Sequence, residues 1–235
     1  MPYFCVILTQ KQRISVAPPG LRRVAFKGTQ MGRELLVLEA ELRDNADGAN
    51  MRLYLSTSHL ESQADHAAAR QAQMNLSMEA LVQAGQSGRF DMALFGGDLN
   101  MRDKEQAVTW KKLGLDASKK APVARDAWEA AGSASASKFT WDLRLNDNVT
   151  MPGGMQPRCR FDRLFFLESM AERQSTGAGG RCTNAIRKFA LVGTKRLDHG
   201  RFVSDHFGVL TEFHCSRFPT GGRSSGDASG PPRRE

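Results

Sequence analysis

The stretch from Phe90 to Asp103, F-D-M-A-L-F-G-G-D-L-N-M-R-D, constrains the fold of this chain most strongly. Met92 to Phe95 form an apolar run of strand length, which two glycines end, and Asp98 and Asn100 follow directly. Side chains two residues apart in an extended backbone point to the same side, so a carboxylate and an amide can face one ligand. The alternative is a plain turn, because Gly, Asp and Asn are also common turn residues.

The length of 235 residues suits one α/β domain with a sizeable core and a tail. We expect the domain to cover residues 1–218. Residues 219–235 are rich in Gly, Ser, Pro and Arg, and we expect a disordered basic tail there because such a segment buries too little apolar surface to fold. The formal net charge of +8 favours an anionic partner such as nucleic acid.

The cysteines and the apolar runs indicate the environment of the chain. Cys5, Cys159, Cys182 and Cys215 are scattered, with no C-x-x-C pair and no histidine at zinc-ligand spacing beside them. This pattern predicts reduced thiols in an intracellular protein. No apolar run approaches transmembrane length and the N-terminus does not resemble a signal peptide, so we expect a soluble protein without a membrane partner.

Strand and helix signals alternate along the chain. Turn residues between 44 and 50 predict a hairpin over 34–57, whose end points Ser58 and His59 outward. A helical pattern covers 63–84, and weaker helical signals run from 105 to 132 with a turn at Pro122. Loops are expected over 133–137 and 146–157, and a flexible insertion over 176–180. Strands are expected over residues 4–8, 34–42, 51–57, 92–95, 160–167 and 209–213.

Five polar clusters lie at the predicted strand ends, where a rigid scaffold meets variable loops. They are S-H-L-E-S at 58–62, G-D-L-N at 97–100, T-W-D at 140–142, Asp162, and S-D-H at 204–206. The chain has no nucleophile elbow, no phosphate-binding Gly-rich loop before a helix and no zinc-spaced His or Cys pair, which excludes nucleophilic hydrolases and NTPases.

The remaining side chains suit metal-assisted hydrolysis of a phosphoester. Carboxylates bind Mg²⁺ through hard oxygen ligands, and one aspartate can position and deprotonate water. An amide and a histidine can stabilise the negative pentacoordinate phosphorus. A histidine donates best to a phosphate oxygen when an aspartate accepts from its other nitrogen, and Asp162 can do this for His206.

The motifs T-S-H-L-E-S, F-G-G-D-L-N-M-R-D, F-T-W-D, R-F-D-R-L-F-F and G-R-F-V-S-D-H-F-G resemble, in this order, those of the tyrosyl-DNA phosphodiesterase 2 group of the endonuclease/exonuclease/phosphatase superfamily. The resemblance extends from Tyr3 to Phe213. It implies an α/β (α+β) sandwich of the DNase I type, in which two mixed β-sheets pack together and helices flank them.

The resemblance also implies a role for each matched residue. Asp98 would activate the attacking water and Asn100 would bind a phosphate oxygen. His206, held by Asp162, would stabilise the transition state, and His59 would contact the phosphate from the other side. Asp205 would lie near a bound Mg²⁺ or Mn²⁺. A DNA-binding groove would be lined by Ser62, Arg102 and Trp141.

The implied substrate is a 5′-phosphotyrosyl bond that joins DNA to a trapped topoisomerase. A phenol with a pKa of about 10 is a better leaving group than an alkoxide, so one metal ion without a strong general acid suffices. We expect a monomer in the nucleus, with the cytoplasm as the alternative location.

One departure from the family pattern precedes Phe4. Family members carry an Asn at the end of the first strand and a Glu in a Q-E motif, the principal Mg²⁺ ligand, upstream of the region that matches residues 4–8. Glu61 does not replace that Glu by position. We therefore expect an N-terminally truncated form that lacks the first strands and helix, binds metal weakly and has low activity.

Several alternatives stay open at this level. The chain can be another phosphoesterase of the same superfamily, such as an abasic-site endonuclease or a phosphatase of inositol lipids or sphingomyelin, or a non-catalytic nucleic-acid-binding fragment. Asp162 can pair with Arg160 instead of a histidine. Ser62 can be the N-cap of the helix that starts at Gln63. Trp141 can be a core residue, as we expect for Trp128.

Overall fold

The structure is a computed structural model that describes residues 4–16, 20–43, 50–115, 124–168 and 182–217. Its strands are β1 (Ile14–Ser15), β2 (Leu21–Ala25), β3 (Glu34–Leu42), β4 (Met51–Ser58), β5 (Met92–Asp98), β6 (Arg125–Asp126), β7 (Trp141–Asp142), β8 (Arg158–Cys159), β9 (Asp162–Glu168), β10 (Cys182–Val192) and β11 (Gly208–Arg217). Its α-helices are α1 (Ala67–Gln86), α2 (Asp103–Leu113) and α3 (Ala127–Ala130), and 3₁₀ turns lie at η1 (Ala64–His66), η2 (Ser135–Ser137) and η3 (Pro152–Gly154).

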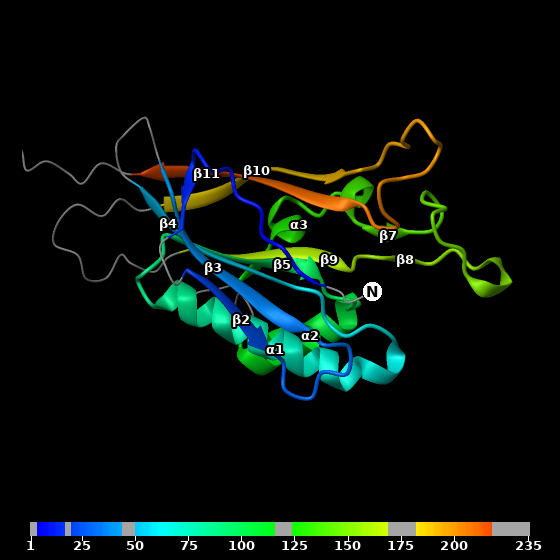
Figure 1. The fold of residues 1–235 in the computed structure, drawn as a ribbon, viewed down its shortest axis with the longest axis horizontal. Helices are drawn as coiled ribbons and strands as arrows, with labels where there is room; N and C mark the ends of the chain where they lie inside the picture. Colours follow the sequence, from blue (N-terminus) through cyan, green and yellow to red (C-terminus); the bar gives the residue numbers. More distant parts are fainter. Residues whose placement is uncertain (1–3, 17–19, 44–49, 116–123, 169–181, 218–235) are drawn as a thin grey trace, which may run out of the picture.

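A seven-stranded mixed sheet forms the centre of the fold. Its strands follow the order β1-β3-β4-β5-β9-β6, and β2 also pairs with β3. Strands β4 and β5 are parallel and are joined by the helix α1, whereas β5 and β9 are antiparallel. The C-terminal ends of β4 and β5 and the N-terminal end of β9 therefore lie together along the edge formed by the strand ends, on the right in Figure 1.

Helices α1 and α2 cover one face of this sheet, and a second, smaller sheet covers the other, with the short helix α3 on the same side as that second sheet (Figure 1). Met74, Met78 and Leu81 of α1 are fully buried against the central sheet in the main apolar core. On the opposite face the antiparallel ribbon of β10 and β11 packs through Phe213, whose ring lies 5.2 Å from that of Phe166. The expected α/β sandwich is thus confirmed. In the described residues its second layer is an antiparallel pair and not a mixed sheet.

The apolar patterns located most elements. The expected strand over 34–42 matches β3, and its antiparallel pairing with β4 confirms the hairpin. Strand β9 and helix α1 also lie where the sequence placed them, although α1 begins at Ala67 and only after the 3₁₀ turn η1. The expected features at Pro122, at 176–180 and at 219–235 lie outside the described residues.

The strand expected over residues 4–8 is wrong. These residues run in extended form without strand pairing in the described part of the chain, and Phe4 and Leu8 are 78% and 87% exposed. An apolar run becomes a strand only where a neighbouring strand accepts and donates its backbone hydrogen bonds. Strands β2 and β10 were missed, because β2 is exposed along its whole length and β10 begins with polar residues.

No helix in the described ranges has the length and apolar character that crossing a membrane requires. Cys5 and Cys159 are free thiols.

Candidate active site

A close approach of two backbones builds the edge at which the polar residues gather. A Cβ atom on Gly97 would lie 2.0 Å from the carbonyl oxygen of Ser58, so only glycine fits between β5 and β4 at this point. Ser58 is buried and donates its hydroxyl to the carbonyl of Glu34, which corrects the expectation that it points outward. Gly97 therefore lets β4 and β5 deliver His59 and Asp98 side by side.

A tight turn fixes the polar residues that follow β5. Asn100 has a φ of 50°, a left-handed conformation that asparagine tolerates better than most residues. Its backbone N–H donates to Oδ1 of Asp98 at 3.0 Å, and its Nδ2 donates to the carbonyl of Leu60 at 3.1 Å. The backbone of Leu60 donates in turn to the carbonyl of Asp98 at 3.0 Å. Asp98 and Asn100 thus form one rigid unit with the S-H-L-E-S segment.

His206 lies between two aspartates. Its Nδ1 is 2.7 Å from Oδ2 of Asp162, and its Nε2 is 4.0 Å from Oδ2 of Asp98. His59 approaches Asp98 from the other side, with 3.3 Å between Nε2 and Oδ2. The predicted contact between Asp162 and His206 is therefore present. Asp162 does not pair with Arg160, whose guanidinium binds the buried carboxylate of Asp126 at 2.6 Å.

Burial and like charges shift the pKa values of this group. Burial, aided by the charge of Asp162, raises the pKa of Asp98 to about 6. Burial and the positive charge of Arg33 lower the pKa of His59 to about 4, so His59 is neutral at pH 7. Burial also lowers the pKa of His206, but the hydrogen bond and charge of Asp162 more than offset this and raise it above its usual range. The site therefore pairs a neutral histidine with a readily protonated one.

The donor set fits a divalent cation in part. Asp98, Asp162 and His206 each offer one ligand atom, and these atoms all lie within 4.8 Å of one another. Carboxylate oxygens suit Mg²⁺ or Mn²⁺, and a cation here would offset the repulsion that raises the pKa of Asp98. Asp205, the ligand expected from the sequence, is not in this group, although its Oδ2 lies 3.9 Å from Nε2 of His206. Its side chain is 46% exposed.

The three residues expected along a groove lie in different places. Arg102 is exposed at the start of α2 and, with Asn100, lines a cavity of about 760 Å³. The ring of Trp141 lies 6.4 Å from that of His206, at the catalytic cluster itself. Ser62 is half-buried against Met31, with 3.4 Å between Oγ and Sδ. Ser62 is not a helix N-cap, since the residue before η1 is Gln63.

Sequence reasoning missed three residues near this site. Phe161 stacks beside His206, with 6.3 Å between ring centroids. Glu61 is fully buried, and its Oε1 accepts from the backbone of Gln30 at 2.7 Å, which ties the loop before β3 to the S-H-L-E-S segment. Arg33, on the same loop, is buried and acts electrostatically on His59. No local pattern marks Arg33, because its partners are distant in sequence.

The environment of Trp128 also differs from the expectation of a core residue. Its side chain is half-buried, and two cations lie over its ring. The guanidinium of Arg160 is 4.6 Å and the ammonium of Lys138 is 5.5 Å from the ring centroid.

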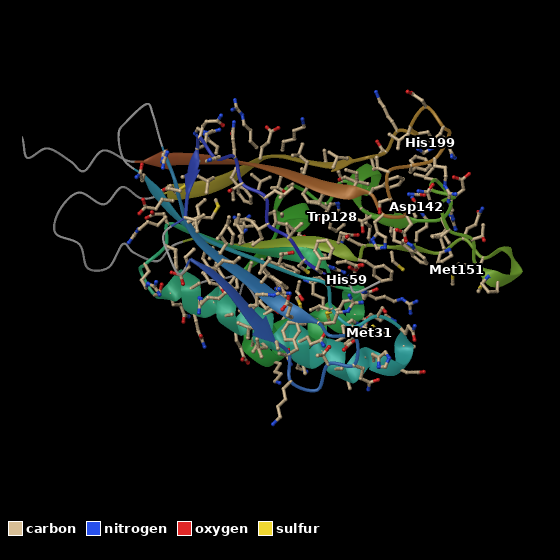
Figure 2. The ribbon with its side chains drawn as sticks, in the orientation of Figure 1. Met31, His59, Trp128, Asp142, Met151 and His199 are labelled. Atoms are coloured by element: carbon tan, nitrogen blue, oxygen red, sulfur yellow. The ribbon has the colours of Figure 1, made fainter. Side chains whose placement is uncertain are left out.

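In Figure 2 His59 lies at the end of the central sheet, between the helix layer and the segment that carries Asp142.

Comparison with known proteins gives consistent relatives. Over 212 residues the chain is 34% identical to tyrosyl-DNA phosphodiesterase 2 of Xenopus laevis, which covers 90% of this chain and 49% of that protein. The human protein of the same name is 33% identical over 210 residues, with 88% and 49% covered. The chain thus spans about half the length of the curated relatives it matches. No family model matches the sequence.

Solved structures agree with these relatives. The Danio rerio tyrosyl-DNA phosphodiesterase 2, complexed with a single-strand DNA product, superposes with a TM-score of 0.67 at 31% identity, covering 87% of this chain and 70% of that one. A mannosyl-6-phosphatase of Bacteroides thetaiotaomicron has a TM-score of 0.57 at 14% identity, with 87% and 68% covered, and shares the fold alone. These similarities, together with the fold and the cluster around His206, show that the chain belongs to the tyrosyl-DNA phosphodiesterase 2 family.

Proposed function

We propose that this chain is a metal-dependent phosphodiesterase that hydrolyses 5′-phosphotyrosyl bonds in DNA. The observation that carries the proposal is the position of His206, whose two ring nitrogens face Asp162 at 2.7 Å and Asp98 at 4.0 Å. The proposal is supported by relatives that are named tyrosyl-DNA phosphodiesterase 2, one of which was solved with a single-strand DNA product.

Asp98 is the proposed general base. A base works best when its pKa lies near the working pH, and the pKa of Asp98 is raised to about 6 by burial and by Asp162. Its Oδ1 is held by the backbone N–H of Asn100 at 3.0 Å, which leaves Oδ2 facing the two histidines. A water between Oδ2 and a bound phosphate would lose its proton to Asp98 as it attacks phosphorus.

His206 and Asn100 are the proposed donors to the phosphate. Asp162 would accept from Nδ1–H of the charged imidazole and so orient the ring with Nε2–H toward the cluster. The charged form is favoured because Asp162 raises the pKa of this ring. Negative charge that develops on the phosphate oxygens in the transition state then meets preorganised donors.

His59 is the proposed neutral contact on the opposite side of the phosphate. Because its pKa is lowered to about 4, it does not compete with His206 for the proton of Asp98 at neutral pH. A neutral imidazole donates one hydrogen bond and keeps one acceptor, so it can bind the phosphate without adding a full charge.

A metal ion completes the proposed site. When bound, Mg²⁺ or Mn²⁺ would supply positive charge that offsets the charge on the phosphate and activates the bound water. Asp162 would hold it, with Asp205 at the exposed rim, while Asp98 keeps its Oδ2 for the attacking water. Two carboxylates are a small oxygen set for a cation that prefers six oxygen ligands, so we expect weak metal binding and low activity.

DNA is the proposed ligand of the cavity beside Asn100. Its walls carry six basic side chains and two acidic ones. Four of the basic side chains pair with carboxylates, whereas Arg102 and Lys104 are exposed and can meet a phosphate backbone. Phe139 and Phe161 in the same walls offer faces on which bases can stack. The basic residues are Arg70, Arg102, Lys104, Lys138, Arg158 and Arg160, and the acidic ones are Asp103 and Glu105.

Release of tyrosine from a 5′-phosphotyrosyl oligonucleotide tests the proposal. We expect turnover with Mg²⁺ or Mn²⁺, loss of turnover with a chelator, and loss in Asp98→Asn. Asp198→Asn, an exposed carboxylate outside the cluster, is the matched control and should keep its activity. Faster cleavage of abasic DNA or of an inositol-lipid or sphingomyelin headgroup would replace the proposed substrate with another of the superfamily.

A non-catalytic DNA-binding role is the second candidate, and the basic cavity is the observation that favours it. It predicts DNA affinity that falls steeply with salt, is unchanged in Asp98→Asn and comes without turnover. We further propose a nuclear monomer, which size-exclusion chromatography and localisation of a tagged chain would check.

A further inference from the structure

We propose that Thr140 is a positioning residue that fixes Asp162 and His206 relative to each other. The inference deepens the proposed function and rests on it, because it concerns the same site. Thr140 precedes β7 in the F-T-W-D motif, where only Trp141 stood out from the sequence. Thr140 accepts hydrogen bonds through its side-chain hydroxyl and through its backbone carbonyl.

The hydroxyl of Thr140 holds the segment that carries Asp162. Its Oγ1 accepts from the backbone N–H of Asp162 at 3.0 Å and from that of Phe161 at 3.1 Å. Asp162 is the first residue of β9 and lies opposite Asp98 of β5, and its N–H donates to Thr140. A single buried oxygen therefore satisfies two donors at the point where the strand begins.

The carbonyl of Thr140 holds the segment that carries His206. It accepts from the backbone N–H of Phe207 at 2.7 Å. The residue itself is only 1% exposed, so its two contacts are sheltered from water, which would otherwise compete for the same donors. One residue thus links the backbones on both sides of the hydrogen bond between Nδ1 of His206 and Oδ2 of Asp162.

The loop that follows Thr140 reinforces this link. Asn146, also 1% exposed, donates from Nδ2 to the carbonyl of Ser204 at 2.9 Å. Asn148 donates to the carbonyl of Phe202 at 2.8 Å and accepts from its N–H at 3.1 Å. The segment with His206 is therefore held along its N-terminal side by asparagines and on its C-terminal side by Thr140.

The substitution Thr140→Val isolates the role of the hydroxyl. Valine has nearly the same shape but no acceptor, so the N–H groups of Phe161 and Asp162 lose their partner while the carbonyl contact to Phe207 can remain. The start of β9 then shifts, and the carboxylate of Asp162 moves relative to His206. Thr140→Ser keeps the acceptor and should restore the wild-type arrangement.

Two measurements on the full chain test this. In the first, the N–H proton of His206 that is shared with Asp162 is followed by NMR without metal or substrate. We expect its low-field signal to be lost or displaced in Thr140→Val and kept in Thr140→Ser. This measurement does not require turnover, so it remains decisive for positioning even if the proposed phosphodiesterase activity is absent.

In the second, kcat and KM are measured on the phosphotyrosyl oligonucleotide. We expect a loss of about tenfold to hundredfold in kcat for Thr140→Val with KM unchanged, since misplacement of catalytic groups by a fraction of an ångström to 1 Å has this effect. Thr109→Val is the matched control. Thr109 is equally buried, in α2, and accepts from Gln71, away from the catalytic cluster.

The outcomes separate the possibilities. Unchanged NMR signal and kcat in Thr140→Val, no recovery in Thr140→Ser, or an equal loss in Thr109→Val would each overturn the proposal. If Thr140→Val does not fold, Thr140→Ala is the second variant, because it removes the hydroxyl without placing a methyl group against the two N–H donors. The same NMR and kcat criteria then apply to it.

Discussion

Asp98 is expected to reduce the stability of the fold that it serves, and Asp98→Asn should therefore stabilise the metal-free protein while abolishing turnover. The carboxylate is 19% exposed and lies within 4.8 Å of a ligand atom of Asp162, so two acidic groups share a poorly hydrated site. Asparagine keeps the shape and the acceptor for the N–H of Asn100 but carries no charge. The substitution thus removes the cost of ionising a buried group and retains its main hydrogen bond.

The magnitude follows from the pKa. Burial and Asp162 raise the pKa of Asp98 from 3.8 to about 6. At about 1.4 kcal/mol for each tenfold change in proton affinity, the ionised carboxylate destabilises the folded state by about 2 to 3 kcal/mol at pH 7.5. For a domain of this size, this corresponds to a gain of roughly 5 to 10 °C in Tm for Asp98→Asn.

The pH dependence has a defined sign. Because the pKa of Asp98 is higher in the folded than in the unfolded chain, the wild type is relatively most stable below the ordinary value of 3.8 and loses stability as the pH rises through about 6. The advantage of Asp98→Asn should therefore be largest near pH 7.5, fall to about 1 kcal/mol at pH 4.5, and be absent below about pH 3.

Thermal or urea unfolding with a chelator present, at pH 7.5 and at pH 4.5, measures both effects. Asp205→Asn is the control, because its half-exposed carboxylate stays hydrated and its removal should change stability by less than about 0.5 kcal/mol. An Asp98→Asn variant that is less stable than the wild type at pH 7.5, or whose advantage does not change between the two pH values, would refute the reasoning.

Two further predictions concern the scaffold. Gly97→Ala should destabilise the protein by more than about 3 kcal/mol and lower activity, because its Cβ would meet the carbonyl oxygen of Ser58 at 2.0 Å. Gly114→Ala is the control, because Gly114 also has a positive φ but a Cβ there would meet nothing within 4 Å. Comparing the two variants separates the steric clash from the cost of a positive φ. Arg160→Met should cost about 3 kcal/mol in urea unfolding, since the buried carboxylate of Asp126 loses its 2.6 Å partner and keeps the more distant guanidinium of Arg163 at 3.6 Å. If Arg160→Met lowers the free energy of unfolding by less than about 1 kcal/mol, as the loss of an exposed ion pair would, the prediction for Arg160 is wrong.

Local patterns predicted much of the fold and most of the site. The apolar run at 92–95 located β5, although the strand continues through both glycines to Asp98, where pairing with β9 holds it. The turn residues after β3 correctly predicted the hairpin with β4. Asp98, Asn100, Asp162, His206 and His59 stood out because several polar clusters recur at predicted strand ends and match the motifs of one family, and the structure places them together. The DNA-groove residues were less well located, since an exposed arginine and an indole have many environments.

The features that could not be predicted from the sequence depend on contacts between residues that are far apart in the chain. The pairing of β10 with β11, the burial of Arg33 beside His59 and the link that Thr140 makes between Asp162 and Phe207 leave no local signal. The pKa values of Asp98 and His59 also arise only when segments far apart in the chain exclude water together. The sequence by itself determined which side chains reach the edge of the sheet, because strand periodicity is local. Only the tertiary structure decided their distances and charges, because burial and electrostatic coupling depend on what packs around them.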